Sequence, residues 1–171
     1  MSDILAFGET WLLENEVEKL EGFQGLFASH GHGKGVGLFT RHKLAKESTK
    51  FSTEKCSLIQ VFFQDINIIA IYLSKNCNQE EFCNFLLQLF SLEQPTLVLG
   101  DFNISANSDS YIKTFFEKSG FSQIIEHPTH DSGSLIDHIC VNKHLSDKKL
   151  ECHQNSVYYS DHDMITLLIE K

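Results

Sequence analysis

The sequence predicts an α/β domain of the α+β kind, in which a mixed β-sheet has helices on its outside. Short apolar segments bounded by turn residues recur along the chain and are typical of buried strands. Two of them, Ser57–Gln64 and Ile68–Leu73, flank the turn sequence 65–67 and predict a hairpin. Helical patterns alternate with the later strands, and this combination favours helices packed against a mixed sheet.

The first half of the chain contains mainly strands. Ile4–Phe7 predicts a short buried strand just before Glu9, and the polar segment 14–20 predicts a loop or a short helical turn. Residues 31–37 are rich in glycine and lead into a strand over Val36–Phe39. They do not form a P-loop, because no Ser or Thr follows Lys34 and no helical pattern comes after it. His30 and His32 could bind a metal there, although a loop without a ligand is the simpler interpretation.

The second half alternates helices and strands. Asn78 predicts the N-cap of a helix over Gln79–Phe90, with Glu81 completing a capping box. A second helix runs from Ser108 to Lys118 and stops at Gly120. Three further strands are predicted in this half of the chain: Thr96–Leu99, Leu135–Val141 and Met164–Ile169.

The length and composition predict a single domain that covers residues 1–171. With 171 residues and 42% hydrophobic content, the chain can bury one substantial core. No apolar run approaches the roughly 20 residues that span a bilayer, so we expect no membrane partner. The five cysteines are scattered without a Cys-x-x-Cys pair, which argues against a zinc site and a disulfide framework. Reduced thiols favour an intracellular protein, nuclear or cytoplasmic.

The net charge of -9 disfavours tight, unassisted binding to nucleic acid, because phosphate contacts supply most non-specific affinity. The charge is uneven, however. The segment Lys34–Lys55 has six basic and two acidic residues, and Arg41 within it is a candidate for binding substrate. A solvated surface is the alternative interpretation of this segment.

Three motifs place carboxylates next to apolar segments. Val98 and Leu99 lead into Asp101, Leu135 and Ile136 into Asp137, and Tyr158 and Tyr159 into Asp161. If these are strand ends, three carboxylates meet at one sheet edge, which is costly unless a cation or shared protons offset their repulsion. The pattern therefore predicts a site. A serine hydrolase is disfavoured because no Gly-x-Ser-x-Gly motif exists.

Together with Glu9, these motifs resemble the endonuclease/exonuclease/phosphatase superfamily, the DNase I-like metal-dependent phosphodiesterases. The landmarks occur in family order over nearly the whole chain: 3–11, 35–38, 70–72, 100–103, 135–138 and 160–162. Pro128-Thr129 followed by 133–138 is most similar to the endonuclease domains of retrotransposons and related mobile elements. The resemblance implies a DNase I-like four-layer sandwich of two mixed β-sheets flanked by helices.

The resemblance also assigns roles. Glu9 is the principal ligand of Mg²⁺, with Mn²⁺ as an alternative ion, and Asp161 holds metal or orders its waters. Asp101 orients or deprotonates the attacking water, and Asn103 binds the phosphate. His162 stabilises the charge that develops on the scissile phosphate.

Three further residues complete the expected site, and a fourth residue, His138, is expected to lie outside it. Asp137 orients the imidazole of His162, and a nearby carboxylate favours the protonated form of a histidine. Tyr72 either binds phosphate or packs in the core. Thr129 is a substrate-binding helper near Asp137. His138 should be structural, because on a strand it faces away from its neighbour.

Family members begin with a strand and a helix that precede the strand leading to Glu9, and no counterpart lies upstream of Met1 in this sequence. We therefore expect an N-terminally truncated fold with an open sheet edge that self-associates or takes a partner chain. The expected function is a magnesium-dependent DNA endonuclease. A phosphatase acting on a small phosphate ester or lipid head group is one alternative, and a catalytically inactive binding module is the other.

Overall fold

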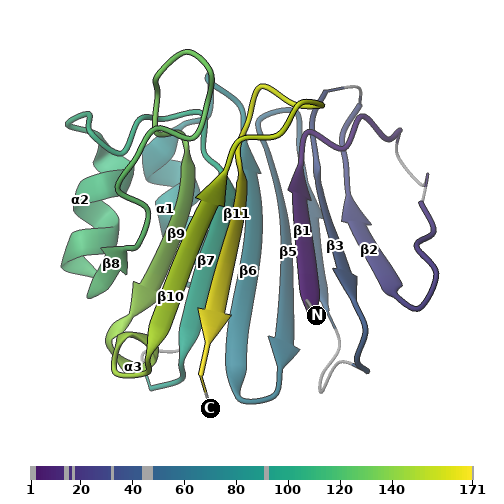
Figure 1. Ribbon diagram of the computed structural model, residues 1–171. Coiled ribbons are helices and arrows are strands. Elements are labelled where there is room, and N and C mark those ends of the chain that lie inside the picture. The colour runs from purple at the N-terminus through teal and green to yellow at the C-terminus, as the bar shows by residue number, and fades with distance from the viewer. Residues whose placement is uncertain are drawn as a thin grey trace.

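The computed structural model describes residues 3–13, 16, 18–31, 33–43, 48–90 and 93–170. Its elements are arranged as two stacked β-layers with helices behind one of them (Figure 1). The strands are β1 (Ile4–Gly8), β2 (Gln24–Ala28), β3 (Val36–Thr40), β4 (Thr49–Ser52), β5 (Cys56–Phe63), β6 (Ile66–Leu73), β7 (Thr96–Asp101), β8 (Phe121–Gln123), β9 (Asp137–Asn142), β10 (Leu150–Asn155) and β11 (Met164–Ile169). The helices are α1 (Gln79–Leu86), α2 (Tyr111–Lys118) and α3 (Lys143–Ser146).

The larger β-layer is a six-stranded mixed sheet with the order β4-β5-β6-β7-β9-β8. Its neighbouring strands are antiparallel except for β6 and β7, which run parallel. The second layer consists of two antiparallel sheets that are not hydrogen-bonded to each other, β1-β3-β2 and β10-β11. Strand β1 therefore pairs only with β3, and β11 only with β10, among the described strands.

Side chains of β6 show how the six-stranded sheet serves two cores. Ile68, Ala70 and Tyr72 face the second β-layer, whereas Ile69, Ile71 and Leu73 pack on the face that carries α1 and α2. Every residue of this strand is buried, since both of its faces are covered. The end of this strand, which leads to the candidate site, is therefore packed on both faces.

The α+β expectation, with helices outside a mixed sheet, is confirmed. Among the described helices, α1 and α2 cover the outer face of the larger sheet, and none covers the outer face of the second β-layer. The described elements therefore supply three of the four expected layers. No helix in the described part of the chain is long and apolar enough to cross a membrane.

The helix boundaries differ from the sequence prediction at two points. Asn78 caps α1 as expected, its side chain accepting from the backbone of Glu80 and Glu81, but the helix ends at Leu86 instead of Phe90. In α2 the cap is Ser110, not Ser108, and its side chain accepts from the backbone N–H of Lys113.

Five elements were not predicted: β2, β4, β8, α3 and β10. Strands β4 and β8 and helix α3 have four residues or fewer, and β10 is mostly polar because alternate residues are exposed, so length or apolar pattern did not mark these four. The predicted segment 14–20 and His32 lie partly or wholly outside the described residues.

Candidate active site

Several strands that carry predicted site residues end or begin at one edge of the two β-layers, the upper edge in Figure 1. Strands β1, β6 and β7 end there, while β9 and β11 begin there. In the six-stranded sheet Tyr72 is paired with Asp101, and Asp101 with Asp137. Asp137 is thus at the start of its strand and not at the end, which corrects the expectation from sequence. An antiparallel strand delivers its first residue to the edge where its neighbour delivers its last.

Gly100 allows the close approach of two strands at this edge, and Gly8 shows which other strand packs beside them. Gly100 has φ +137°, and a Cβ atom there would lie 1.9 Å from the carbonyl oxygen of Ile71, so only glycine fits beside β6. A Cβ on Gly8 would lie 3.4 Å from Cβ of Asp101, which shows that the end of β1 packs against the end of β7. Glu9 follows directly and has φ +47°, a left-handed conformation that is uncommon for a non-glycine residue.

Asp101 is the most buried carboxylate of the site, with 3% of its surface exposed. Its Oδ1 accepts from the backbone N–H of Asn103 at 2.8 Å, and its Oδ2 accepts from the Asn103 amide at 3.0 Å. Burial is the main reason that the pKa of Asp101 rises to about 7, and the negative charges of Asp137 and Glu9 add to this rise. The bond from Asn103 and the charge of His162 act in the opposite direction.

Asn103 connects Asp101 to the end of β6. Its backbone is left-handed at φ +50°, and its side-chain amide also donates to the carbonyl oxygen of Leu73 at 2.9 Å. Burial, then the charges of Glu9 and Asp101, raises the pKa of Tyr72 to about 12, so this phenol stays neutral. In the described structure Asn103 orients Asp101, and Tyr72 is largely buried in the core between the β-layers.

His162 and Asp137 form the shortest charged contact of the site. Nδ1 of His162 lies 2.8 Å from Oδ2 of Asp137, and both side chains are about four-fifths buried, at 22% and 17% exposed. The hydrogen bond to Asp137 is the largest cause that raises the pKa of His162 to about 9, and the charges of Asp137, Asp101 and Asp161 add to it against partial burial. The imidazole is therefore positively charged at neutral pH.

Thr129 holds the backbone at Asp137 in place through hydrogen bonds. Its side chain is fully buried, and its hydroxyl oxygen accepts from the backbone N–H groups of Ile136 and Asp137 at 3.3 and 3.1 Å. A substrate cannot reach it there, which corrects its predicted role in binding substrate. Thr129 is a positioning residue, and its carbonyl oxygen also accepts from the backbone N–H of Asp163 at 2.8 Å.

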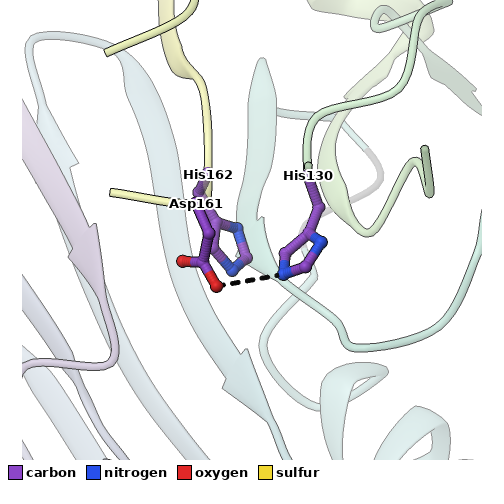
Figure 2. Close-up of side chains that lie close together, drawn as sticks. All are labelled: His130, Asp161 and His162. Atoms are coloured by element: carbon purple, nitrogen blue, oxygen red, sulfur yellow. Dashed lines mark ion pairs between the residues drawn. The ribbon is translucent and has the colours of Figure 1, made fainter. Parts of the chain in front are cut away.

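Figure 2 shows a cluster that the sequence did not reveal: His130 beside Asp161 and His162. Nε2 of His130 lies 3.3 Å from Oδ2 of Asp161, and the two imidazole rings meet edge to face at 4.8 Å between centroids. Within the described residues this group offers three ligand atoms within 4.8 Å of one another. His130 reaches the site because its backbone forms an isolated antiparallel β-bridge with that of His162. This long-range pairing has no local sequence signal.

Two expectations for individual residues have clear outcomes. Arg41 follows β3 at the end opposite to Gly8, where it lies over the ring of Phe23 at 4.1 Å, so it is not part of this site. His138 is structural, as expected: Nε2 contacts the Ile104 carbonyl oxygen at 2.8 Å, and the ring stacks on Phe102. Burial also lowers the pKa of His138.

Tyr158 and Tyr159 do not form a buried strand before Asp161. They occupy a turn between β10 and β11, with 100% and 69% of their surfaces exposed. Their rings touch edge to face at 5.3 Å. An apolar pair is too short a signal to distinguish a strand from a turn, which is why the prediction was wrong.

The carboxylates and imidazoles at this edge of the β-layers are suitable ligands for a divalent cation. The charges of Glu9 and Asp137 oppose ionisation of Asp101, and this repulsion is what a bound cation would relieve. Carboxylate oxygens are the ligands that Mg²⁺ prefers, and one or two suffice because the ion keeps several waters. The imidazoles of the cluster in Figure 2 would suit a transition ion such as Mn²⁺ or Zn²⁺ better, but only in their neutral form, which the raised pKa of His162 disfavours.

Known proteins provide an independent comparison. The model of the endonuclease/exonuclease/phosphatase family matches residues 1–162. No curated protein sequence matches this chain. The chain is similar to the structure of an AP endonuclease from Archaeoglobus fulgidus, with a TM-score of 0.78 and 14% identity over 99% of this chain and 89% of that one.

Two further solved structures are similar. A 3′ phosphatase from Neisseria bound to a product DNA hairpin has a TM-score of 0.76 and 14% identity over 99% of this chain and 89% of that one. The endonuclease domain of TRAS1, a telomere-specific non-LTR retrotransposon, has a TM-score of 0.67 and 14% identity over 88% of this chain and 79% of that one. These likenesses establish a DNase I-like fold.

Proposed function

Because the chain belongs to the endonuclease/exonuclease/phosphatase family, we propose that it hydrolyses phosphodiester bonds, with DNA as substrate and Mg²⁺ as metal. The observation that carries the proposal is the convergence of Asp101, Asp137 and a positively charged His162 at one sheet edge. Hydrolysis of a phosphodiester needs an activated water and neutralisation of phosphate charge. This edge offers groups for both.

Glu9 and Asp161 are the proposed metal ligands. Glu9 stands at the end of β1 beside Asp101, and Asp161 is two-thirds exposed, so an ion with its waters has access to both carboxylates. When bound, the cation supplies Lewis-acid polarisation of the phosphate and lowers the pKa of coordinated water. The Mn²⁺ ion is an alternative because it also accepts carboxylate and imidazole ligands.

The protein groups act on either side of the phosphate. His162 donates a hydrogen bond to a phosphate oxygen through Nε2, because its Nδ1 is held by Asp137. Asp101, with a pKa near 7, orients the attacking water and takes its proton, while Asn103 keeps this carboxylate in place. Thr129 fixes Asp137, and through it the imidazole.

The test is a metal titration with two substrates, supercoiled plasmid DNA and a p-nitrophenyl phosphate diester. We expect nicking of the plasmid that requires Mg²⁺, and a loss of roughly 10²–10⁴ in rate for Asp101→Asn and for His162→Ala. Circular dichroism of both variants controls for folding. Wild-type nicking by both variants would show a contaminating nuclease and refute the proposal.

A second candidate is hydrolysis of a small phosphate ester, which the net charge of -9 favours because a small substrate needs few phosphate contacts. Turnover of the small diester without nicking would support it. Absence of both activities at every metal concentration would indicate the third alternative, a catalytically inactive binding module.

We also propose that the free edges of β1 and β11 support self-association or capture of a partner strand. Each strand has one partner among the described strands, and unpaired strand edges are templates for pairing. Analytical ultracentrifugation should show a concentration-dependent dimer, and a monomer at all concentrations would refute this. An intracellular location, nuclear or cytoplasmic, is part of the proposal, supported by five free cysteines.

A further inference from the structure

The turn that carries Tyr158 and Tyr159 lies directly beside the candidate site. Tyr158 is completely exposed and Tyr159 is 69% exposed, which is a large aromatic surface to leave in water. Only Ser160 separates them from Asp161 and His162. Because residues span at most about 3.6 Å each, both rings start within roughly 11 Å of the Asp161 backbone.

The turn is anchored on its C-terminal side. The carbonyl oxygen of Asp161 accepts from the backbone N–H of Asp131 at 2.9 Å, and the hydroxyl of Ser160 accepts from the backbone N–H of His162 at 3.0 Å. The rings also touch each other, at 5.3 Å between centroids. Binding a ligand on this turn therefore costs less ordering than binding on a freely moving loop.

The affinity of the site for nucleic acid also needs a source other than phosphate contacts. The chain has a net charge of -9, and Arg41, the basic candidate from the sequence, is at the opposite end of β3. Stacking of bases on aromatic rings supplies affinity that tolerates any base sequence and does not depend on positive charge. The two exposed tyrosine rings can provide such stacking. Only an unpaired base can use them, because a base inside a duplex is already stacked on its neighbours.

We propose that Tyr158 and Tyr159, whose rings meet edge to face, each offer a ring face for stacking of an unpaired base next to the phosphate held at His162, so that the preferred ligand is single-stranded nucleic acid. This rests on the proposed function for the position of the phosphate. Stacked nucleotides repeat every 3.4 Å or so, so the bases concerned lie within about three nucleotides of the scissile bond.

The experiment measures binding of a fluorescein-labelled single-stranded 20-nucleotide DNA by anisotropy, in the Asp101→Asn chain so that hydrolysis does not interfere. Replacing both tyrosines with alanine should weaken binding roughly 5- to 150-fold, the range for loss of one stacked base, while replacing both with phenylalanine should retain it. Tyr111→Ala is the matched control: this tyrosine on α2 is 49% exposed and belongs to the helical layer. It should bind as the parent does.

Two further readouts separate stacking from other roles. The slope of log affinity against log salt should be shallow, no steeper than about -1.5, which corresponds to about two phosphates on a single strand. In the catalytically intact chain, the alanine pair should raise KM for DNA and leave turnover of the small p-nitrophenyl diester unchanged. Failure of the proposed function would abolish turnover but leave the binding result interpretable.

Three results would overturn the inference. They are unchanged binding by the alanine pair, an equal loss in Tyr111→Ala, and equal weakening by the phenylalanine pair. The last result would indicate that hydroxyl contacts, and not the ring faces, hold the DNA.

Discussion

The most informative perturbation is Asp137→Asn. It replaces the carboxylate that keeps His162 charged with a neutral amide of the same shape. The hydrogen bond from Nδ1 to Oδ2 spans 2.8 Å and is the largest cause of the raised pKa of His162. Without that carboxylate we expect the pKa to fall from about 9 towards the ordinary histidine value of about 6.5. At pH 7.5 the protonated share would drop from nearly all molecules to roughly one tenth.

The same shift sets the effect on stability. A fall of about 2.5 pKa units corresponds to at most roughly 3.4 kcal/mol, and because both side chains contact solvent we expect about 1–3 kcal/mol. A folded-state pKa that is raised contributes stability in full below the unfolded value and loses it as pH rises through the folded value. The destabilisation should therefore be largest below about pH 6.5, shrink between pH 6.5 and 9, and be small above pH 9.

The assay is an NMR titration of the His162 ring, combined with urea unfolding of both proteins at pH 6.5 and 10. Nicking of plasmid at pH 7.5 should fall at least tenfold in the variant. A pKa of His162 within half a unit of the wild-type value would refute the reasoning, as would a stability difference that grows with pH.

Substitutions at four other positions have expected outcomes. Thr129→Val leaves two buried backbone N–H groups without their acceptor and should cost about 1–3 kcal/mol in urea unfolding, whereas Thr129→Ser should be near neutral. Gly100→Ala would place a carbon 1.9 Å from the Ile71 carbonyl oxygen. This clash should destabilise the fold, so that the variant no longer shows the cooperative thermal unfolding transition of the wild type at the wild-type midpoint temperature. Glu9→Gln should raise the Mg²⁺ concentration for half-maximal activity, and an unchanged titration would remove Glu9 from the metal site. Arg41→Ala should change kcat and KM for DNA by less than about twofold, because this side chain lies at the far end of β3.

The sequence by itself determined the class of the fold and the set of acids. Apolar segments of strand length marked β1, β3, β5, β6, β7, β9 and β11, because burial of a strand requires such segments whatever lies around them. The acid motifs were visible because Asp101, Asp137 and Asp161 each stand beside an apolar pair. Asn78 likewise marked the start of α1, since capping depends on neighbours in sequence.

Only the tertiary structure decided what surrounds those acids. Thr129 is buried beneath Asp137, and Arg41 is at the far end of its strand, because strand pairing and direction place them there. His130 joins Asp161 through a bridge between distant loops, and Tyr158 is exposed because its turn lies outside both β-layers. Local propensity acts over a few residues, whereas position in a site depends on register between strands far apart in the chain, so a single sequence carries the first kind of information and not the second.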